Sequence, residues 1–591
     1  MLHQDTIAGG PAAPSRPSGL HRHWRWLLRA VGIAAAGLAI GEWSGPSMPY
    51  GVWFWLWLTG LAAFVASFPP AQRRCPFPSP VVLLWLLGIL SLAVALRLPR
   101  IADIPANISI DELLPAMEAM HLARGNPVNV FSSVGWFTMP NLSFAFPAVV
   151  MKVIGVSFYA QRLSSFLVGM GGLIATYLLA RRLFGDVAAL TATFLMAVSF
   201  WHIHNSRTGF PFVQSSFCPA LVLYLLVRAR QDGSRAGLAA AGVVLGFLVQ
   251  CYFPVRILLV AAPLFLGMDW LAQRTPLRTV CAEAAIVATG AGLVLGPLLM
   301  SVPLDTLAGR SVGVLLGRPA VLDSSEHFYH LTGLWMVFTR NLAESAQMFT
   351  SWADVCVLNR SPGGLLDAGT LAALLLGILL AVLRGGEYVW FLLVWGAFTF
   401  VVGTAFTDAP RASYRLAAAM PAFFILAGMG IEHLLAAAEP SSRWYRRTVR
   451  FAVLLALAVW VGRENYRMFF IRYVNADGHE TVGSMELRAM GEDCDGRVFY
   501  FFGSEPQGSE TQLFCADQRT LNRGQLPGLV NVTRPATFFV ADWQRQWLEN
   551  LRACYPDAVV APHISPDGRA LFTRVDVPII QLIAPRPACA G

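Results

Sequence analysis

Charged residues are scarce in this chain of 591 residues. They make up 13% of it, and only 35 residues are Asp or Glu, whereas soluble domains carry about a quarter charged residues. With a mean hydropathy of +0.54, this scarcity excludes an ordinary soluble protein. The net charge of +9 would suggest nucleic acid as a partner of a soluble protein. No basic-aromatic platform for bases is present, so arginine-rich cytoplasmic loops explain that charge better.

Metal-binding cysteine patterns are also missing. The 9 cysteines form no CxxC pair and no Cys/His spacing typical of a zinc site. Cys218, Cys251 and Cys281 lie in apolar segments, where we expect them to serve packing.

Long apolar runs dominate what is present. Runs of about 17–22 residues are long enough to cross a bilayer as helices, and continuous rather than alternating hydrophobicity excludes a closed barrel. We therefore predict a mainly α, polytopic fold of about thirteen spans, with ends uncertain by a few residues. The expected spans are 25–42, 51–68, 80–97, 162–180, 187–203, 212–228, 236–252, 256–272, 280–300, 366–383, 387–406, 414–437 and 449–463.

The distribution of arginine predicts the orientation of these spans. With a cytoplasmic N-terminus, all the basic clusters fall on the inner side, as the positive-inside rule requires. Counting 141–156 as a further span would invert everything after it, so we expect a short interfacial or re-entrant helix there. The basic clusters are 21–25, 73–74, 181–182, 228–235, 274–278, 384 and 443–450.

The same assignment divides the chain into parts. Residues 1–20 look disordered and cytoplasmic, and 21–477 form the transmembrane domain. Its first external loop, 98–161, is the expected catalytic loop, and 301–365 is the second large external loop. The first apolar run has no small-residue cleavage site after it, so it is predicted to be a retained anchor rather than a signal peptide.

Residues 478–591 have the composition of a small external α/β domain. Strands are predicted at 498–502, 537–540 and 570–573, and a helix at 543–553. Four cysteines lie here, an even number in what would be an oxidising compartment. Their pairing is left open, with Cys494–Cys515 the preferred pair; the four are Cys494, Cys515, Cys554 and Cys589.

Four segments in order resemble polytopic GT-C type glycosyltransferases, in particular the PMT/ArnT-like group related to glycosyltransferase family 39. They are Ser-Ile-Asp-Glu at 109–112, then 155–165, 177–185 and 199–209, and the match covers roughly residues 80–270. The resemblance implies a GT-C fold, a polyprenyl-phosphate sugar as donor, and an external first loop with juxtamembrane helices.

Asp111 and Glu112 are the expected catalytic residues. Transfer of a sugar from a lipid phosphate needs a base that takes the proton of the acceptor hydroxyl. We assign this role to Asp111, and acceptor orientation or pKa support to Glu112, because adjacent carboxylates raise one another's pKa. The alternative interpretation is a helix cap, since Ser109-x-x-Glu112 is a capping box.

The departing phosphate needs cations on the same external side. Arg207, Arg256, Arg411 and Arg415 stand at outer ends of spans, and in relatives an arginine-containing loop before a late span binds the lipid phosphate. The alternative is interfacial snorkelling. His204, Tyr252 and Trp136 are further possible substrate contacts, although Trp136 could instead enter lipid.

A divalent metal is not expected, nor is any other cofactor. Oligosaccharyltransferase-like relatives carry acids soon after the segment that contains Arg207, whereas this chain continues Gly-Phe-Pro-Phe-Val-Gln at 209–214. This segment therefore lacks the hard oxygen ligands that a divalent cation prefers. The apolar-aromatic segment 135–141 also departs from close relatives and leaves the acceptor open.

The predicted function is inverting transfer of a sugar from a polyprenyl-phosphate carrier to an acceptor hydroxyl on a protein, lipid or envelope glycan. The expected location is a bacterial cytoplasmic (inner) membrane, with the active-site loops and C-terminal domain on the periplasmic side. Alternatives are a polymerase, ligase or oligosaccharyltransferase, a transporter or flippase, which would need charges at mid-membrane, and a non-catalytic assembly protein.

Overall fold

The structure is a computed structural model. Segment 1–18, most of the expected disordered N-terminus, lies outside the described residues, and so do Cys494, Cys515 and Cys589. The described residues are 19–43, 51–70, 76–273, 275–351, 354, 362–437, 444–475, 481–491, 497–502, 513, 535–565 and 568–583.

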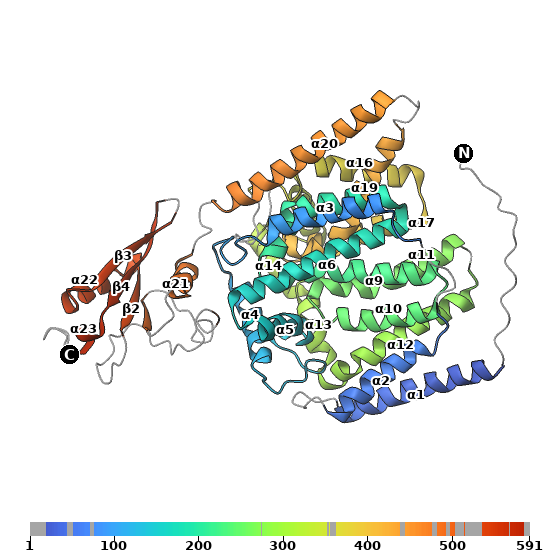
Figure 1. The fold of residues 1–591 in the computed structure, drawn as a ribbon, viewed down its shortest axis with the longest axis horizontal. Helices are drawn as coiled ribbons and strands as arrows, with labels where there is room; N and C mark the ends of the chain where they lie inside the picture. Colours follow the sequence, from blue (N-terminus) through green and yellow to red (C-terminus); the bar gives the residue numbers. More distant parts are fainter. Residues whose placement is uncertain are drawn as a thin grey trace.

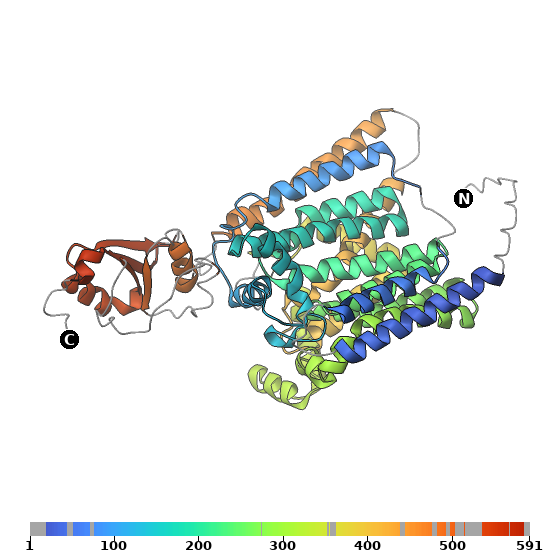
Figure 2. The same cartoon turned by 60° about the horizontal axis from the view of Figure 1, so that its bottom comes forward.

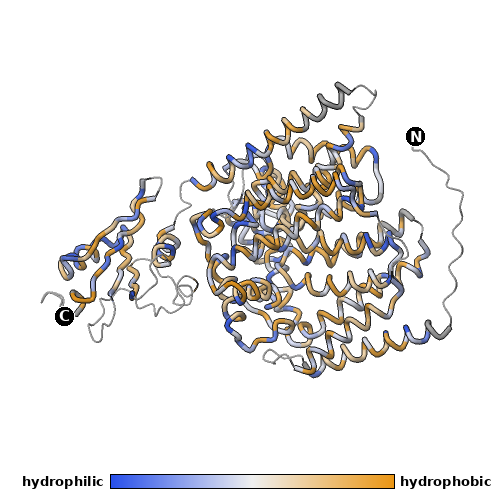
Figure 3. The backbone as a smooth tube through the Cα atoms, viewed as in Figure 1, coloured by the Kyte–Doolittle hydropathy of each residue, from blue (hydrophilic) through white to orange (hydrophobic). Residues whose placement is uncertain are grey.

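Every expected span coincides with a helix, and these helices run side by side as one bundle (Figures 1 and 2). Hydrophobic residues line them along their length (Figure 3). The helices are α1 Gly19–Trp43, α2 Val52–Ala66, α3 Pro80–Arg97, α6 Phe158–Phe184, α7 Asp186–Val198 with α8 Phe200–Arg207, α9 Gln214–Gln231, α10 Arg235–Leu248, α11 Leu258–Gln273, α12 Leu277–Ser301, α16 Ala368–Arg384, α17 Glu387–Phe400, α19 Met420–Ala437 and α20 Trp444–Tyr466.

Fewer helices than the thirteen expected spans meet the criteria of length and hydropathy for crossing a membrane. Within the described part of the chain, 7 helices are long and apolar enough, and an eighth if α7 and α8, bent by 61°, count as one. Ser199 adopts an extended conformation at this bend, and the freed Phe200 N–H donates to Asn465 Oδ1 at 2.8 Å. The mainly α membrane fold is confirmed, while the count of about thirteen spans stays a prediction.

Glycines let several helices approach closely. A Cβ at Gly377 in α16 would lie 2.1 Å from the carbonyl oxygen of Leu426 in α19. One at Gly242 in α10 would lie 2.4 Å from Val287 O in α12. Small residues at such contacts allow backbone-to-backbone packing, which replaces the hydrophobic driving force that is missing between helices in lipid.

Short helices occupy both large loops. The loop after α3 contains α4 Ile110–Ala123, the 3-10 turn η1 Trp136–Thr138 and α5 Leu142–Ile154, and α5 packs against α4 and α6. The loop after α12 contains α13 Leu304–Gly313, α14 Pro319–Tyr329 and α15 Leu334–Gln347. Helices α4 and α5 lie at the end of the bundle that faces the C-terminal domain (Figures 1 and 2).

Short elements connect the later helices on this side. They are η2 Pro211–Val213, η3 Phe253–Ile257, the π-helical η5 Val401–Ala405, α18 Ser413–Leu416, the 3-10 turn η6 Ala417–Ala419, and the π-helical η7 Arg467–Tyr473.

The C-terminal α/β domain is built on a four-stranded sheet of order β1-β2-β4-β3. β1 and β2 are parallel and the other pairs antiparallel. One face packs on α22 and α23, and the other packs on α21. The elements are α21 Val482–Gly491, β1 Val498–Phe502, β2 Ala536–Ala541, α22 Arg545–Cys554, β3 Val559–Ile564, β4 Ala570–Val577 and α23 Ile579–Ile583.

This sheet confirms the expected small domain, although β3 and α21 were not predicted. Cys554 at the end of α22 is disulfide-bonded, as expected for a compartment that permits disulfides. The preferred pair Cys494–Cys515 lies outside the described residues.

The glycine contacts predict a stability effect. Gly377→Ala should lower the stability of the detergent-solubilised protein by about 1–3 kcal/mol, because the added methyl group overlaps Leu426 O. Gly292→Ala in α12 is the matched control, since nothing lies within 4 Å of its Cβ position. Thermal unfolding of both variants checks this, and equal midpoints would contradict the close packing of α16 on α19.

Candidate active site

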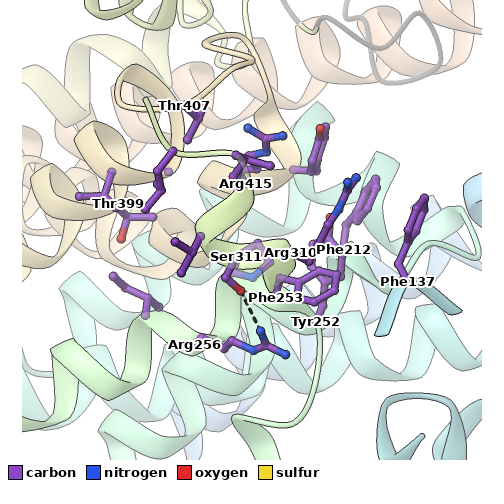
Figure 4. Close-up of a pocket in the computed structure, with 18 of the residues that line it drawn as sticks. Phe137, Phe212, Tyr252, Phe253, Arg256, Arg310, Ser311, Thr399, Thr407 and Arg415 are labelled. Atoms are coloured by element: carbon purple, nitrogen blue, oxygen red, sulfur yellow. Dashed lines mark hydrogen bonds between the residues drawn. The ribbon is translucent and has the colours of Figure 1, made fainter. Parts of the chain in front are cut away.

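One cavity brings the two large loops together with the helix bundle. Its volume is about 380 Å³, and the side chains point into it from opposite walls (Figure 4). One end is polar and aromatic, whereas the end between α11 and α17 is apolar. The lining residues include Asp111, Trp136, Phe137, Phe212, Tyr252, Phe253, Arg256, Ile257, Val260, Arg310, Ser311, Phe398, Thr399, Val402, Thr407, Tyr414 and Arg415.

Asp111 lies in the first turn of α4 and lines this cavity. Ser109 caps the helix by accepting the Asp111 N–H at 3.1 Å. Within the described part of the chain, no hydrogen bond engages the Asp111 carboxylate. Burial raises the pKa of this carboxyl group, and the nearby Arg310 guanidinium opposes that rise. The geometry therefore leaves Asp111 available as a base with an elevated pKa.

Glu112 points away from the cavity into the protein. Its carboxylate accepts two hydrogen bonds from Arg162, from Nε at 2.7 Å and Nη2 at 3.2 Å, with both side chains at most 1% exposed. The same carboxylate accepts the Gly209 N–H at 2.5 Å. A Cβ at Gly209 would lie 2.9 Å from Glu112 Cγ. The structure thus places Glu112 outside the cavity, where it connects α4 to α6 and to the segment after α8.

Arg207 also lies outside the cavity, apart from the other arginines expected to bind phosphate. Its guanidinium is fully buried and donates to backbone carbonyls at 2.8–3.1 Å, so the group is saturated by protein acceptors. The accepting carbonyls are those of Leu96, Arg97, Pro99, Arg100 and Ile104.

Two of the other expected arginines line the cavity. Arg256 donates to Ser311 Oγ at 2.8 Å and to Leu307 O, and lies over the Phe253 ring. Arg415 donates to Asp408 at 2.7 Å. Arg411 is not among the lining residues, and its Nε lies 3.3 Å from Glu344 in α15. The structure therefore does not bring Arg411 together with the other cations.

The possible substrate contacts divide in the same way. Trp136 and Tyr252 line the cavity. Phe212 joins Tyr252 to Tyr414, with ring centroids 5.0 and 4.9 Å apart. His204 is buried elsewhere, with its ring 5.1 Å from that of Tyr473 in η7. His204 therefore lies apart from Trp136 and Tyr252, which line the cavity.

Arg310 is the residue that the sequence reasoning missed. It lies on α13 in the second large loop, points into the cavity, and has its guanidinium 4.6 Å from the Phe137 ring. No hydrogen bond from it to the described residues is recorded, so its donors are free for a ligand. The available signal was an arginine on the external side in an amphipathic stretch, against the positive-inside bias.

The carboxylates do not form a metal site in the described part of the chain. No group of three or more His, Cys, Asp or Glu side chains is found there, and Asp111 is the one carboxylate among the described residues that line the cavity. Metal-independent chemistry stays a prediction.

Comparisons with known proteins agree with this architecture. Residues 139–294 match the family model described as dolichyl-phosphate-mannose-protein mannosyltransferase. No curated protein sequence gives a significant match. Among solved structures, ArnT from Cupriavidus metallidurans in the apo state is 13% identical, with a TM-score of 0.50 over 85% of this chain and 99% of that chain.

Two other structures are similar at lower scores. ArnT from Cupriavidus metallidurans bound to undecaprenyl phosphate is 13% identical, with a TM-score of 0.47 and coverage of 83% of this chain and 98% of that one. The Archaeoglobus fulgidus oligosaccharyltransferase AglB, in complex with an inhibitory peptide and a dolichol-phosphate, is 14% identical, with a TM-score of 0.46 and coverage of 83% and 74%.

The resemblance to the PMT/ArnT-like group is confirmed by sequence over residues 139–294 and, for most of the chain, by the GT-C fold. The family match includes α5, α6 and the segment from Ser199 to Gly209. It therefore contains Arg162 and Gly209, the two partners that hold Glu112.

The electrostatic contact between Asp111 and Arg310 predicts a pH effect. Arg310 lowers the pKa of Asp111, so Arg310→Gln should raise it. A base works only when deprotonated, and the acidic limb of the kcat/KM–pH profile should therefore move to higher pH. Asp305→Asn, an exposed change on α13 outside the cavity, is the control. An unmoved acidic limb in Arg310→Gln would separate Arg310 from Asp111.

The buried pair of Glu112 with Arg162 predicts a folding defect. Glu112→Gln should destabilise the protein by about 3–5 kcal/mol, because it leaves the Arg162 charge buried without its partner. Glu118→Gln, on the same helix and not among the residues that line the cavity, is the matched control. Yield and thermal unfolding in detergent measure the effect; normal stability with lost activity would instead indicate a chemical role for Glu112.

Proposed function

We propose that this protein transfers a monosaccharide from a polyprenyl-phosphate donor to an acceptor hydroxyl, with inversion at the anomeric carbon. The observation that carries the proposal is the cavity itself. It combines one unbonded carboxylate, three arginines and an apolar end between membrane helices. These three features match the three parts of the reaction: a proton to remove, a phosphate to stabilise and a lipid chain to hold.

Asp111 supplies the base in this scheme. Its carboxylate takes the proton of the acceptor hydroxyl as the oxygen attacks the anomeric carbon. The bond from that carbon to the phosphate oxygen breaks on the opposite side, so the configuration inverts. The products are the glycosylated acceptor, protonated Asp111 and free polyprenyl phosphate, and the proton then returns to solvent.

Arg256, Arg310 and Arg415 stabilise the departing phosphate, which gains one negative charge as the bond breaks. The three arginines, with Asp111 and the Asp408 that pairs with Arg415, have a formal net charge of one positive unit. A phosphodiester with an uncharged sugar balances this charge, whereas a diphosphate or an amino sugar would leave an excess charge in the cavity.

The apolar end accounts for the lipid. Ile257 and Val260 of η3 and α11 line the cavity together with Phe398 and Val402 of α17 and η5. An isoprenoid chain entering here from the bilayer would bury apolar surface at about 25 cal/mol per Å². The phosphate would then reach the arginines without leaving the membrane interface. Undecaprenyl phosphate is the ligand of one ArnT structure and is a suitable probe here.

The cavity is compact, which favours transfer of a single sugar. Its volume of about 380 Å³ is near the lower end of small-molecule sites, roughly 300–1,000 Å³, and must hold both phosphate and sugar. The aromatic rings of Tyr252, Phe212 and Tyr414 offer faces for the apolar side of a sugar ring. Hexose or pentose and the identity of the acceptor are left to experiment.

The external face of a bacterial cytoplasmic membrane is the location we propose. The arginine clusters of the sequence predict that the loops bearing Asp111 and Arg310 lie outside. The disulfide at Cys554 supports the same side for the C-terminal domain.

Replacement of Asp111 tests the proposal. Asp111→Asn should reduce transfer by at least about 10²-fold, because general base catalysis typically contributes 10²–10⁴-fold. Binding of undecaprenyl phosphate should persist, since the arginines and the apolar end are unchanged. The assay is release of undecaprenyl phosphate from a panel of undecaprenyl-phosphate hexoses and pentoses by reconstituted protein, with envelope extract as acceptor.

Asp305→Asn is the matched control and should retain wild-type turnover. Undiminished transfer by Asp111→Asn would refute the assignment of the base. Absence of release by the wild-type protein with every donor of the panel would refute the donor class.

A further inference from the structure

The loop that carries Asp111 is held by hydrogen bonds to its carbonyl groups. Between the end of α3 and the start of α4 the backbone is irregular, and its carbonyls cannot be satisfied by a helix. Arg207 takes three of them, those of Pro99, Arg100 and Ile104, and two more from the last turn of α3. Arg162 takes four more, donating to Ile101 O at 3.2 Å, Ala102 O at 3.0 Å, Pro105 O at 2.8 Å and Asn107 O at 3.1 Å.

A third arginine reaches the same loop from the C-terminal domain. Arg488 in α21 donates to Ala102 O at 2.8 Å, to Pro105 O at 3.1 Å and to Ala106 O. Arg162 and Arg488 therefore share the carbonyls of Ala102 and Pro105 as acceptors. Arg162 belongs to the membrane bundle, and Arg488 lies more than 300 residues later in the chain, so the two parts of the protein meet on this loop.

Ser484, one turn before Arg488 on α21, binds the loop where α4 begins. Its hydroxyl accepts the Ile108 N–H at 3.1 Å and donates to Asn107 Oδ1 at 2.7 Å. Ile108 directly precedes Ser109, the residue that caps α4 and accepts the Asp111 N–H. Only Ser109 and Ile110 lie between Ile108 and Asp111, whose carboxylate faces the cavity.

Apolar packing fixes α21 between this loop and the sheet. Met485, Leu487 and Met490 of α21 belong to one hydrophobic cluster with Ile108 and Leu113 on one side. The same cluster includes Phe499, Phe501, Phe539 and Phe572 from the sheet. A shift of the C-terminal domain would therefore be transmitted to the backbone at the start of α4.

We propose that α21 of the C-terminal domain positions the catalytic base, with Arg488 and Ser484 as the positioning residues. Neither is among the described residues that line the cavity, and they act on Asp111 through the 101–109 backbone. The C-terminal domain is then a part of the active-site support as well as a separate folded unit. This inference rests on the proposed role of Asp111 as the base.

The expected effect falls on turnover rather than on donor binding. Arg256, Arg310 and Arg415 come from other elements, so a loosened 101–109 loop leaves the donor site in place. A displacement of a catalytic group by about 1 Å can cost roughly 10²-fold in rate. Since Arg162 still holds the loop, we expect a loss of about tenfold to 10²-fold in kcat for Arg488→Ala, and a smaller loss for Ser484→Ala.

The experiment compares four full-length variants: Arg488→Ala, Arg488→Lys, Ser484→Ala, and Arg545→Ala as the control. The exposed Arg545 lies on α22 of the same domain and pairs only with Asp542 among the described residues. The measurements are kcat and donor KM for release of undecaprenyl phosphate, the thermal midpoint, and the pH profile. Arg488→Lys should recover only part of the lost turnover. Lysine also donates hydrogen bonds, but it supplies fewer donors than the guanidinium of arginine.

The pH profile separates positioning from general destabilisation. Burial raises the pKa of Asp111, so a loosened loop that admits water should move the acidic limb of kcat/KM to lower pH. Lower kcat at unchanged KM, with this movement and an unchanged control, supports the proposal. Wild-type kcat in Arg488→Ala overturns it, as does a loss explained entirely by unfolding. Inactive wild-type protein would instead refute the proposed function.

Discussion

The carbonyl groups between α3 and α4 set the constraint on which the site depends. Residues 96–107 leave a helix and run irregularly beside the membrane bundle, where unsatisfied backbone groups are costly. Three guanidinium groups, from Arg162, Arg207 and Arg488, satisfy ten of these carbonyls. The accepting residues are 96, 97, 99, 100, 101, 102, 104, 105, 106 and 107.

This arrangement explains why two adjacent carboxylates have different roles. Consecutive residues of a helix point about 100° apart, so one turn of α4 presents Asp111 to the cavity and Glu112 to the bundle. Glu112 neutralises Arg162 and binds Gly209 N–H, which fixes the rotation of α4 about its axis. The rotation in turn fixes where the Asp111 carboxylate points. A buried ion pair thus orients the Asp111 carboxylate.

Much of the fold could be predicted because apolar runs and alternating strands are local signals. Arginine counts also predict a side of the membrane for each loop. That prediction grouped Asp111, Arg256, Arg415, Tyr252 and Trp136, which all line the cavity. The sequence could not supply the direction in which each side chain points. Arg207 and Arg411 are predicted at outer ends of spans, as Arg256 is. In the structure Arg207 donates to backbone carbonyls, whereas Arg411 lies beside Glu344. Arg310 was missed because its helix, α13, lies within a loop and is not the end of a predicted span.

The arginines show how a supporting cation differs from a ligand-binding one. A guanidinium has five N–H donors in a rigid plane and can serve several carbonyls at once, which a lysine cannot. Arg207 makes five backbone bonds and has no capacity left for a phosphate. Arg310 makes none with the described residues and faces the cavity. Counting donors in this way separates the two arginines by geometry, although the sequence places both in loops predicted to be external. It also accounts for Arg488, whose bonds to the loop make it part of the same support as Arg162 and Arg207.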